Sequence, residues 1–230
     1  KEQPAANAIA VEWMRSRIQR STAEIDGLFT QFRISEALMA TYKLIWDDLC
    51  SWYLESIKPA FVNGVGEPID RSTYDATIIL FEDVMKLLHP FMPFLSEELW
   101  HLLRDRKEGE DLIIGTWPNS GEGDVKLEAE MQHAFDLVTA LRNVRNERGM
   151  SPKEALEVEA LGTGTLREAA VLVVKKLANI TELRSVQQAR SGSVVFLVGT
   201  AEYGVDLGGT LDAEAEVRKA EEELAYLRGF

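Results

Sequence analysis

The stretch A-L-R-N-V-R-N-E-R-G-M-S-P, residues 140–152, places Arg142, Arg145 and Arg148 three residues apart. This spacing sets the three guanidiniums along one side of a helix. Only Glu147 opposes them, so three positive charges against one negative leave the stretch at +2. A planar guanidinium fork fits phosphate oxygens and base edges, and it equally fits a carboxylate. The pattern leaves open a nucleic-acid contact and a set of ion pairs to the acidic middle of the chain.

A second candidate surface lies on a helix expected over residues 7–31. At about 100° per residue, one side of this helix carries Trp13, Arg17 and Arg20. The opposite side carries its apolar positions, which are Val11, Met14, Ile18 and Ile25. An indole among guanidiniums on the expected solvent side could stack on unpaired bases while the cations contact phosphates. The alternative is that Trp13 packs on another domain that lies outside this chain, and that Arg17 and Arg20 pair with acidic neighbours.

Catalytic and metal-binding signatures are not found in the sequence. His89, His101 and His133 lack the HExxH spacing, and Cys50 is the single cysteine. No glycine-rich phosphate loop and no G-x-S-x-G motif occurs. We therefore predict no catalytic residue, no metal site and no cofactor in this chain, and we interpret each histidine as structural.

Composition limits the class of protein further. The 230 residues are 46% hydrophobic and 27% charged, which is typical of a folded protein, and the formal net charge is −13. Such acidity argues against a general nucleic-acid binder, because nonspecific affinity comes from phosphate neutralisation. No apolar run approaches the roughly 18 residues that span a bilayer, and the first residues do not resemble a signal peptide. We expect no membrane partner and, with one cysteine, a cytoplasmic location.

The elements that must position these residues are five helices forming a bundle over residues 1–150. They are expected over 7–31, over 35–57, from Ser72 to His89, from a cap at Ser96, and over 125–148. The aromatic runs at 46–53 and 89–94 are interpreted as core, and the inward face of the second helix is expected to carry Leu38, Tyr42, Ile45, Leu49 and Trp52. Glu97 and Glu98 are interpreted as a solvated helix start and not as a catalytic pair.

Beyond residue 150 the pattern changes. Alternating and apolar segments around one amphipathic helix predict a small β-α-β-β unit over 152–207. Heptad spacing then predicts the start of a coiled-coil arm over 208–230. The predicted fold class is mainly α, with a helical bundle followed by a small α/β unit and a truncated coiled-coil helix.

Class I aminoacyl-tRNA synthetases of the valyl, isoleucyl and leucyl group carry, in their helical anticodon-binding domain, a segment that resembles L-L-H-P-F-M-P-F-L-S-E-E-L-W at residues 87–100. Further similar segments in the same order are W-M-R-S-R-I at 13–18, W-D-D-L-C-S-W-Y-L-E-S-I-K-P at 46–59 and R-N-V-R-N-E-R-G-M-S-P at 142–152. The H-P-F-M-P-F form and the tail E-Y-G-V-D-L-G-G-T-L-D-A-E-A-E are most similar to the valyl branch. Isoleucyl enzymes typically end in a cysteine-rich zinc module, which one cysteine cannot supply.

The resemblance implies a tRNA-binding part of an enzyme whose catalytic and editing domains, with their ATP and Mg²⁺, lie outside this chain. It implies a valine-specific tRNA as partner, no DNA and a monomeric parent. It also implies that Arg17, in the pair Ser16-Arg17, contacts anticodon nucleotides, and it gives less support for Trp13 and Arg20. It assigns no individual contact to Arg142, Arg145 or Arg148. Two alternatives stay open: the same domain of an isoleucyl or leucyl enzyme, and a helical protein-interaction module without an RNA role.

Overall fold

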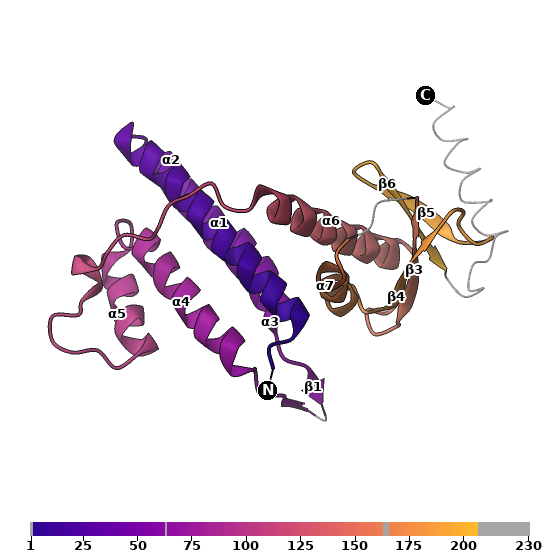
Figure 1. Cartoon of the computed structure of the whole chain (residues 1–230), viewed down its shortest axis with the longest axis horizontal. Helices are drawn as coiled ribbons and strands as arrows, with labels where there is room; N and C mark the ends of the chain where they lie inside the picture. The colour runs from indigo at the N-terminus through magenta and orange to yellow at the C-terminus, as the bar shows by residue number, and fades with distance from the viewer. Residues whose placement is uncertain (1, 63, 163–165, 207–230) are drawn as a thin grey trace. The chain divides into compact units, whose positions relative to one another are not determined.

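A computed structural model describes residues 2–62, 64–162 and 166–206, which fall into two compact units (Figure 1). The first unit contains the residues up to Phe135 together with Arg167–Val173. The second contains Asp136–Leu166 and the described residues from Val174 onward. Within the described ranges, no helix combines the length and apolar character that a bilayer crossing requires. The mainly α bundle and the small α/β unit are confirmed, whereas the domain limits expected at 150 and 207 stay predictions.

The first unit is built around α1 (Ala5–Thr30), which confirms the first expected helix. Its neighbours include α2 (Ile34–Lys43) and α4 (Arg71–Leu88), and α5 (Pro93–Leu103) packs in turn on α4 (Figure 1). Because α1 is covered from several sides, buried residues occur around much of its circumference. A two-stranded hairpin, β1 (Phe61–Val62) with β2 (Val65–Gly66), precedes α4.

The second expected helix is continuous but contains a π-helical stretch. It runs through α2 into η1 (Leu44–Tyr53) and ends in α3 (Leu54–Ile57). Its buried positions are Ala37, Thr41, Leu44, Leu49, Tyr53, Ser56 and Ile57, so the spacing widens to five residues between Leu44 and Leu49. A π-helix bonds residue i to i+5, which rotates the following face relative to an α-helix.

This rotation corrects the expected inward face of the second helix. Leu38 and Tyr42 are 43% and 51% exposed, although helical spacing placed them with Leu49 in the core. Trp46, interpreted as core from its aromatic surroundings, is 59% exposed. If α-helical spacing is counted back from Leu49 through the π-helical stretch, it places exposed residues of α2 in the core.

The expected cap of α5 is also wrong. The helix begins at Pro93, where a missing N–H and a fixed φ suit the first position, and Ser96 lies inside it. The buried Ser96 hydroxyl donates to the Met92 carbonyl at 2.8 Å and lies 2.8 Å from His89 Nδ1. His89 therefore has a structural partner, as expected.

Glu97 does not form a solvated helix start. Its carboxylate accepts hydrogen bonds from the backbone N–H groups of Leu112 at 2.6 Å and Ile113 at 3.3 Å. These two residues open the short 3₁₀-helix η2 (Leu112–Ile114), whose first N–H groups need acceptors. Glu97 thus joins α5 to the segment that follows it.

The second unit contains a four-stranded sheet with the order β4-β3-β6-β5. In chain order the described elements from residue 156 onward are β3 (Leu156–Leu161), α7 (Glu168–Ala178), β4 (Ile180–Val186), β5 (Val194–Val198) and β6 (Ala201–Asp206), and α7 belongs to the second unit only from Val174 onward. Strands β3 and β4 are parallel, and β6 is antiparallel to both β3 and β5. The described residues from 156 to 206 therefore run β-α-β-β-β, one strand more than predicted.

Strand β6 was missed because E-Y-G-V-D was interpreted as the approach to the coiled-coil arm. It is an interior strand because β3 and β5 pair with it on either side, and its Tyr203 and Val205 are 1% and 0% exposed. The helix α6 (Val125–Glu147) confirms the fifth expected helix. The arm expected over 208–230 lies outside the described residues.

We predict that Asp70 stabilises the fold in a pH-dependent way. Asp70 caps α4: its Oδ1 accepts from the Thr73 N–H at 2.8 Å and its Oδ2 from Asn7 Nδ2 at 3.3 Å. Burial alone would raise the pKa of Asp70, but these hydrogen bonds hold that pKa below its ordinary value. The folded pKa is the lower one, so the stabilisation is complete above the unfolded pKa of about 3.9 and is lost as the pH falls through the folded pKa.

Denaturant unfolding at pH 7 and pH 3 checks this. Asp70→Ala should lower the free energy of unfolding by about 1 kcal/mol at pH 7. Asp70→Asn keeps an oxygen acceptor, so its free energy of unfolding should fall less than that of Asp70→Ala at pH 7. At pH 3 its free energy of unfolding should approach that of the wild type. An equal gap between wild type and Asp70→Asn at both pH values would contradict the role of the charge.

Candidate nucleic-acid interface

Arg17 and Arg20 meet on one carboxylate of the same unit. Glu128, in the first turn of α6, is only 6% exposed. Its Oε1 accepts from Ser16 Oγ at 2.5 Å, and its Oε2 accepts from Arg17 Nη1 at 3.1 Å and from Arg20 Nη1 at 2.5 Å. Arg17 Nε also donates to Asp48 Oδ2 at 2.9 Å. The network fastens the start of α6 and η1 to α1.

The charges of this network are matched inside the protein. Desolvation opposes the charged form of Arg17, but Asp48 and Glu128 outweigh it and raise the arginine pKa. Burial raises the pKa of Asp48, and the Arg17 guanidinium offsets part of that rise. The structure thus supports the alternative left open by the sequence, in which Arg17 and Arg20 pair with acidic neighbours. An RNA contact by either arginine stays a prediction.

Trp13 does not form part of an exposed platform. It is 3% exposed, and its ring meets Phe135 edge-on at 5.0 Å between centroids. Phe135 stacks in turn on Trp52 at 4.3 Å. The beginning of α6 therefore covers the side of α1 that the amphipathic pattern assigned to solvent. A base cannot stack on Trp13 while this packing holds, and the expected exposure was wrong.

The three arginines at 142–148 belong to the second unit. Arg145 is 4% exposed and donates to the carbonyls of Ser151 at 3.1 Å, Glu154 at 2.6 Å, Ala178 at 2.9 Å and Asn179 at 3.0 Å. Desolvation lowers the pKa of Arg145, with Glu154 opposing that shift. Since its fork is filled by carbonyls, we correct its assignment as an RNA contact: Arg145 ties the end of α6 to the end of α7.

Arg142 and Arg148 lie on α6 and directly after it, on either side of Arg145 in the sequence. Arg142 is exposed, and its Nη2 donates to the Leu177 carbonyl at 3.3 Å. Leu177 lies in the last turn of α7, where a cation also suits the negative end of the helix dipole. Arg148 is half-buried and follows the last residue of α6. Its backbone N–H donates to the Val144 carbonyl at 3.1 Å. Their RNA contacts stay predictions.

The junction between α1 and α2 presents an aromatic side chain that helical periodicity does not predict. Phe32 is 88% exposed and has a φ of 58°. Its N–H bonds to the Phe29 carbonyl at 3.0 Å, and the Arg33 N–H bonds to the Leu28 carbonyl at 2.9 Å. This pair of bonds is a Schellman helix end, in which the left-handed position favours glycine. A bulky residue there is strained by about 1 kcal/mol, and such strain concentrates at functional sites.

Beyond Phe32, large apolar side chains stay exposed along α2 and into η1, among them Leu38, Tyr42 and Trp46. Tyr42 and Trp46 stack in parallel, with centroids 6.2 Å apart and an interplanar angle of 8°. A pocket of about 510 Å³ between α1 and α2 is lined in part by Arg33 and Lys43. We call Phe32, Arg33, Tyr42, Lys43 and Trp46 the stacking surface. It combines aromatic faces with two cations on neighbouring turns, which is what single-stranded nucleic-acid sites use.

Comparison with known families decides the assignment. A family model described as "Anticodon-binding domain of tRNA ligase" matches residues 11–160, which include every residue of the stacking surface. The chain belongs to this family. Arg17, Glu128 and the α1–α2 junction are therefore parts of an anticodon-binding domain.

Curated relatives of the domain agree. The chain is 41% identical over 228 residues to a valine–tRNA ligase of Parabacteroides distasonis, covering 99% of this chain and 25% of the relative. It is also 41% identical to the valine–tRNA ligase of Porphyromonas gingivalis, covering 99% of this chain and 25% of the relative. With the valine–tRNA ligase of Christiangramia forsetii the identity is 40%, covering 100% of this chain and 26% of the relative. The chain thus spans about a quarter of the length of these proteins.

We predict that Arg17 stabilises the anticodon-binding domain. Arg17→Ala removes a partner from Asp48 and from the buried Glu128, so it should lower the free energy of unfolding by about 1–3 kcal/mol. Arg15→Ala is the matched control, because Arg15 is an exposed cation on the same helix and should change stability by less than about 0.5 kcal/mol. Urea unfolding measures both. If Arg17→Ala is as stable as Arg15→Ala, the ion pairs do not hold α1 and the guanidinium is available to RNA.

Proposed function

We propose that the chain binds the anticodon arm of a tRNA as part of a valine–tRNA ligase. The observation that carries the proposal is the stacking surface, with Phe32 88% exposed at a strained helix end, inside a domain of the anticodon-binding family. Anticodon bases are unpaired, so their faces can leave the loop and stack on aromatic rings. Valine specificity is supported by the relatives, which are valine–tRNA ligases at about 40% identity.

The charge distribution supports selective binding over general binding. With a net charge of −13, most of the protein repels a phosphate backbone, and RNA should approach where cations meet aromatic rings. Arg33 and Lys43 supply such cations on the stacking surface, although Arg33 also pairs with Glu36. The side chain of Arg20 is 43% exposed, and it stays a proposed phosphate contact together with Arg142 and Arg148. Few phosphate contacts mean a shallow dependence of affinity on salt.

The proposal extends to the whole protein. Its activity would be the attachment of valine to tRNA with ATP and Mg²⁺ used by parts outside this chain. It would act in the cytoplasm as a monomer, without DNA or membrane partners. These statements rest on the relatives and on the acidic composition of this chain.

We predict that Phe32→Gly separates binding from stability. Glycine relieves the left-handed strain, so the melting temperature should stay the same or rise. Loss of one stacking ring should weaken tRNA binding by about 1–3 kcal/mol, roughly 5- to 150-fold in Kd. Fluorescence anisotropy with a tRNA carrying a valine anticodon measures the Kd at several salt concentrations, and Trp46→Ala should lose affinity similarly.

Two controls make this test decisive. Phe94→Ala removes an aromatic ring that is 91% exposed but lies on α5, outside the stacking surface, and it should keep the wild-type Kd. An anticodon-swapped tRNA should bind the wild type more weakly. Equal losses in Phe32→Gly and Phe94→Ala, or equal binding of both tRNAs, would contradict the proposed function and favour a protein-interaction role for the stacking surface.

A further inference from the structure

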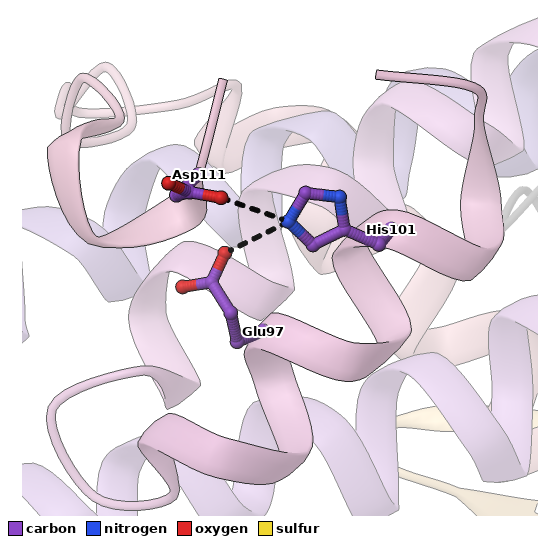
Figure 2. Close-up of side chains that lie close together, drawn as sticks. All are labelled: Glu97, His101 and Asp111. Atoms are coloured by element: carbon purple, nitrogen blue, oxygen red, sulfur yellow. Dashed lines mark hydrogen bonds and ion pairs between the residues drawn. The ribbon is translucent and has the colours of Figure 1, made fainter. Parts of the chain in front are cut away.

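Glu97, His101 and Asp111 form a cluster of side chains of the kinds that bind metal ions. The cluster lies on α5 and the segment after it and shares no residue with the stacking surface. Glu97 and His101 occupy positions i and i+4 of α5, so both face the same side of the helix. Asp111 approaches from the segment that leads into η2. Figure 2 shows both carboxylates pointing toward the same ring nitrogen of His101.

The distances suit a shared metal ion. His101 Nε2 lies 3.1 Å from Asp111 Oδ1 and 3.4 Å from Glu97 Oε1, and the three ligand atoms lie within 4.8 Å of one another. In a tetrahedral zinc site with bonds of about 2.0–2.2 Å, two ligand atoms are about 3.3–3.6 Å apart. A ring nitrogen carries at most one proton, so it cannot donate well to both carboxylates at once. One cation among the three would satisfy all of them.

The Glu97 carboxylate is oriented before any ion binds. Its Oε1 accepts from the Leu112 N–H and its Oε2 from the Ile113 N–H. Second-shell hydrogen bonds of this kind fix a ligand's direction and strengthen metal sites. Because the donors follow directly after Asp111, the same short segment supplies one ligand and orients another.

We propose that Glu97, His101 and Asp111 bind one divalent transition-metal ion of the zinc class. An imidazole nitrogen with carboxylate oxygens suits zinc, whereas magnesium and calcium prefer oxygen ligands alone. Three protein ligands leave the fourth tetrahedral position for water. The ion clamps α5 to the segment that leads into η2 and so stabilises this edge of the anticodon-binding domain. The site does not depend on tRNA binding.

The test uses the 230-residue chain, stripped with EDTA and titrated with ZnCl₂ by calorimetry. We expect one ion per chain and a higher melting temperature with zinc. Co²⁺ in place of zinc should give the visible absorption of a tetrahedral site. Asp111→Asn and His101→Gln should each weaken binding at least about 10-fold. Asp111 is half-exposed at 51% of its side chain, so its variant keeps the test valid if His101→Gln folds poorly.

Glu98→Gln is the matched control, because it removes a neighbouring exposed carboxylate of the same helix and should bind zinc as the wild type does. MgCl₂ should not displace the zinc. The proposal is overturned if the wild type shows no saturable zinc binding up to millimolar concentration, if Asp111→Asn binds zinc with unchanged affinity, or if Glu98→Gln weakens binding as much as Asp111→Asn. Binding of magnesium as tightly as zinc would overturn the assigned class of ion.

Discussion

A carboxylate that is 6% exposed must be neutralised where it lies, and in this domain that carboxylate is Glu128. Ser16, Arg17 and Arg20 supply the partners, so the beginning of α6 is fixed against α1 by charge as well as by apolar contact. The same placement brings Phe135 onto Trp13 and closes the core on that side. Arg17 and Arg20 thus hold two helices of the domain together. Under the proposed function, the anticodon bases stack on the α1–α2 junction.

The sequence predicted the fold well where one apolar period governs one helix. The helices α1, α4 and α6 follow from regular spacing, and the fold class follows from their order. Prediction failed where distant segments meet. Trp13 is buried by Phe135, which lies 122 residues later, and no local pattern contains that contact. The exposure of Tyr42 and Trp46 depends on the π-helical stretch, and E-Y-G-V-D forms a strand only because β3 and β5 pair with it.

The candidate site lies where local rules are broken. Phe32 occupies a helix-end position that favours glycine and exposes an aromatic ring that would ordinarily be buried. A sequence signal does exist: an aromatic residue followed by arginine joins two helices without glycine or asparagine. This signal is weaker than the helical spacing of apolar residues, because a short connection between helices has no repeating pattern. The three arginines at 142–148 gave a stronger sequence signal for RNA binding. The guanidinium of the middle one, Arg145, nevertheless donates its hydrogen bonds to four backbone carbonyls.

Under the proposed function, unpaired bases meet the α1–α2 junction and not the face that carries Trp13. Photo-crosslinking distinguishes these two surfaces, with 4-thiouridine placed in the anticodon loop of the tRNA and crosslinked peptides mapped by mass spectrometry. We expect crosslinks to residues 32–46, centred on Phe32, Tyr42 and Trp46. Crosslinks concentrated on residues 13–20, with none at 32–46, would contradict this expectation.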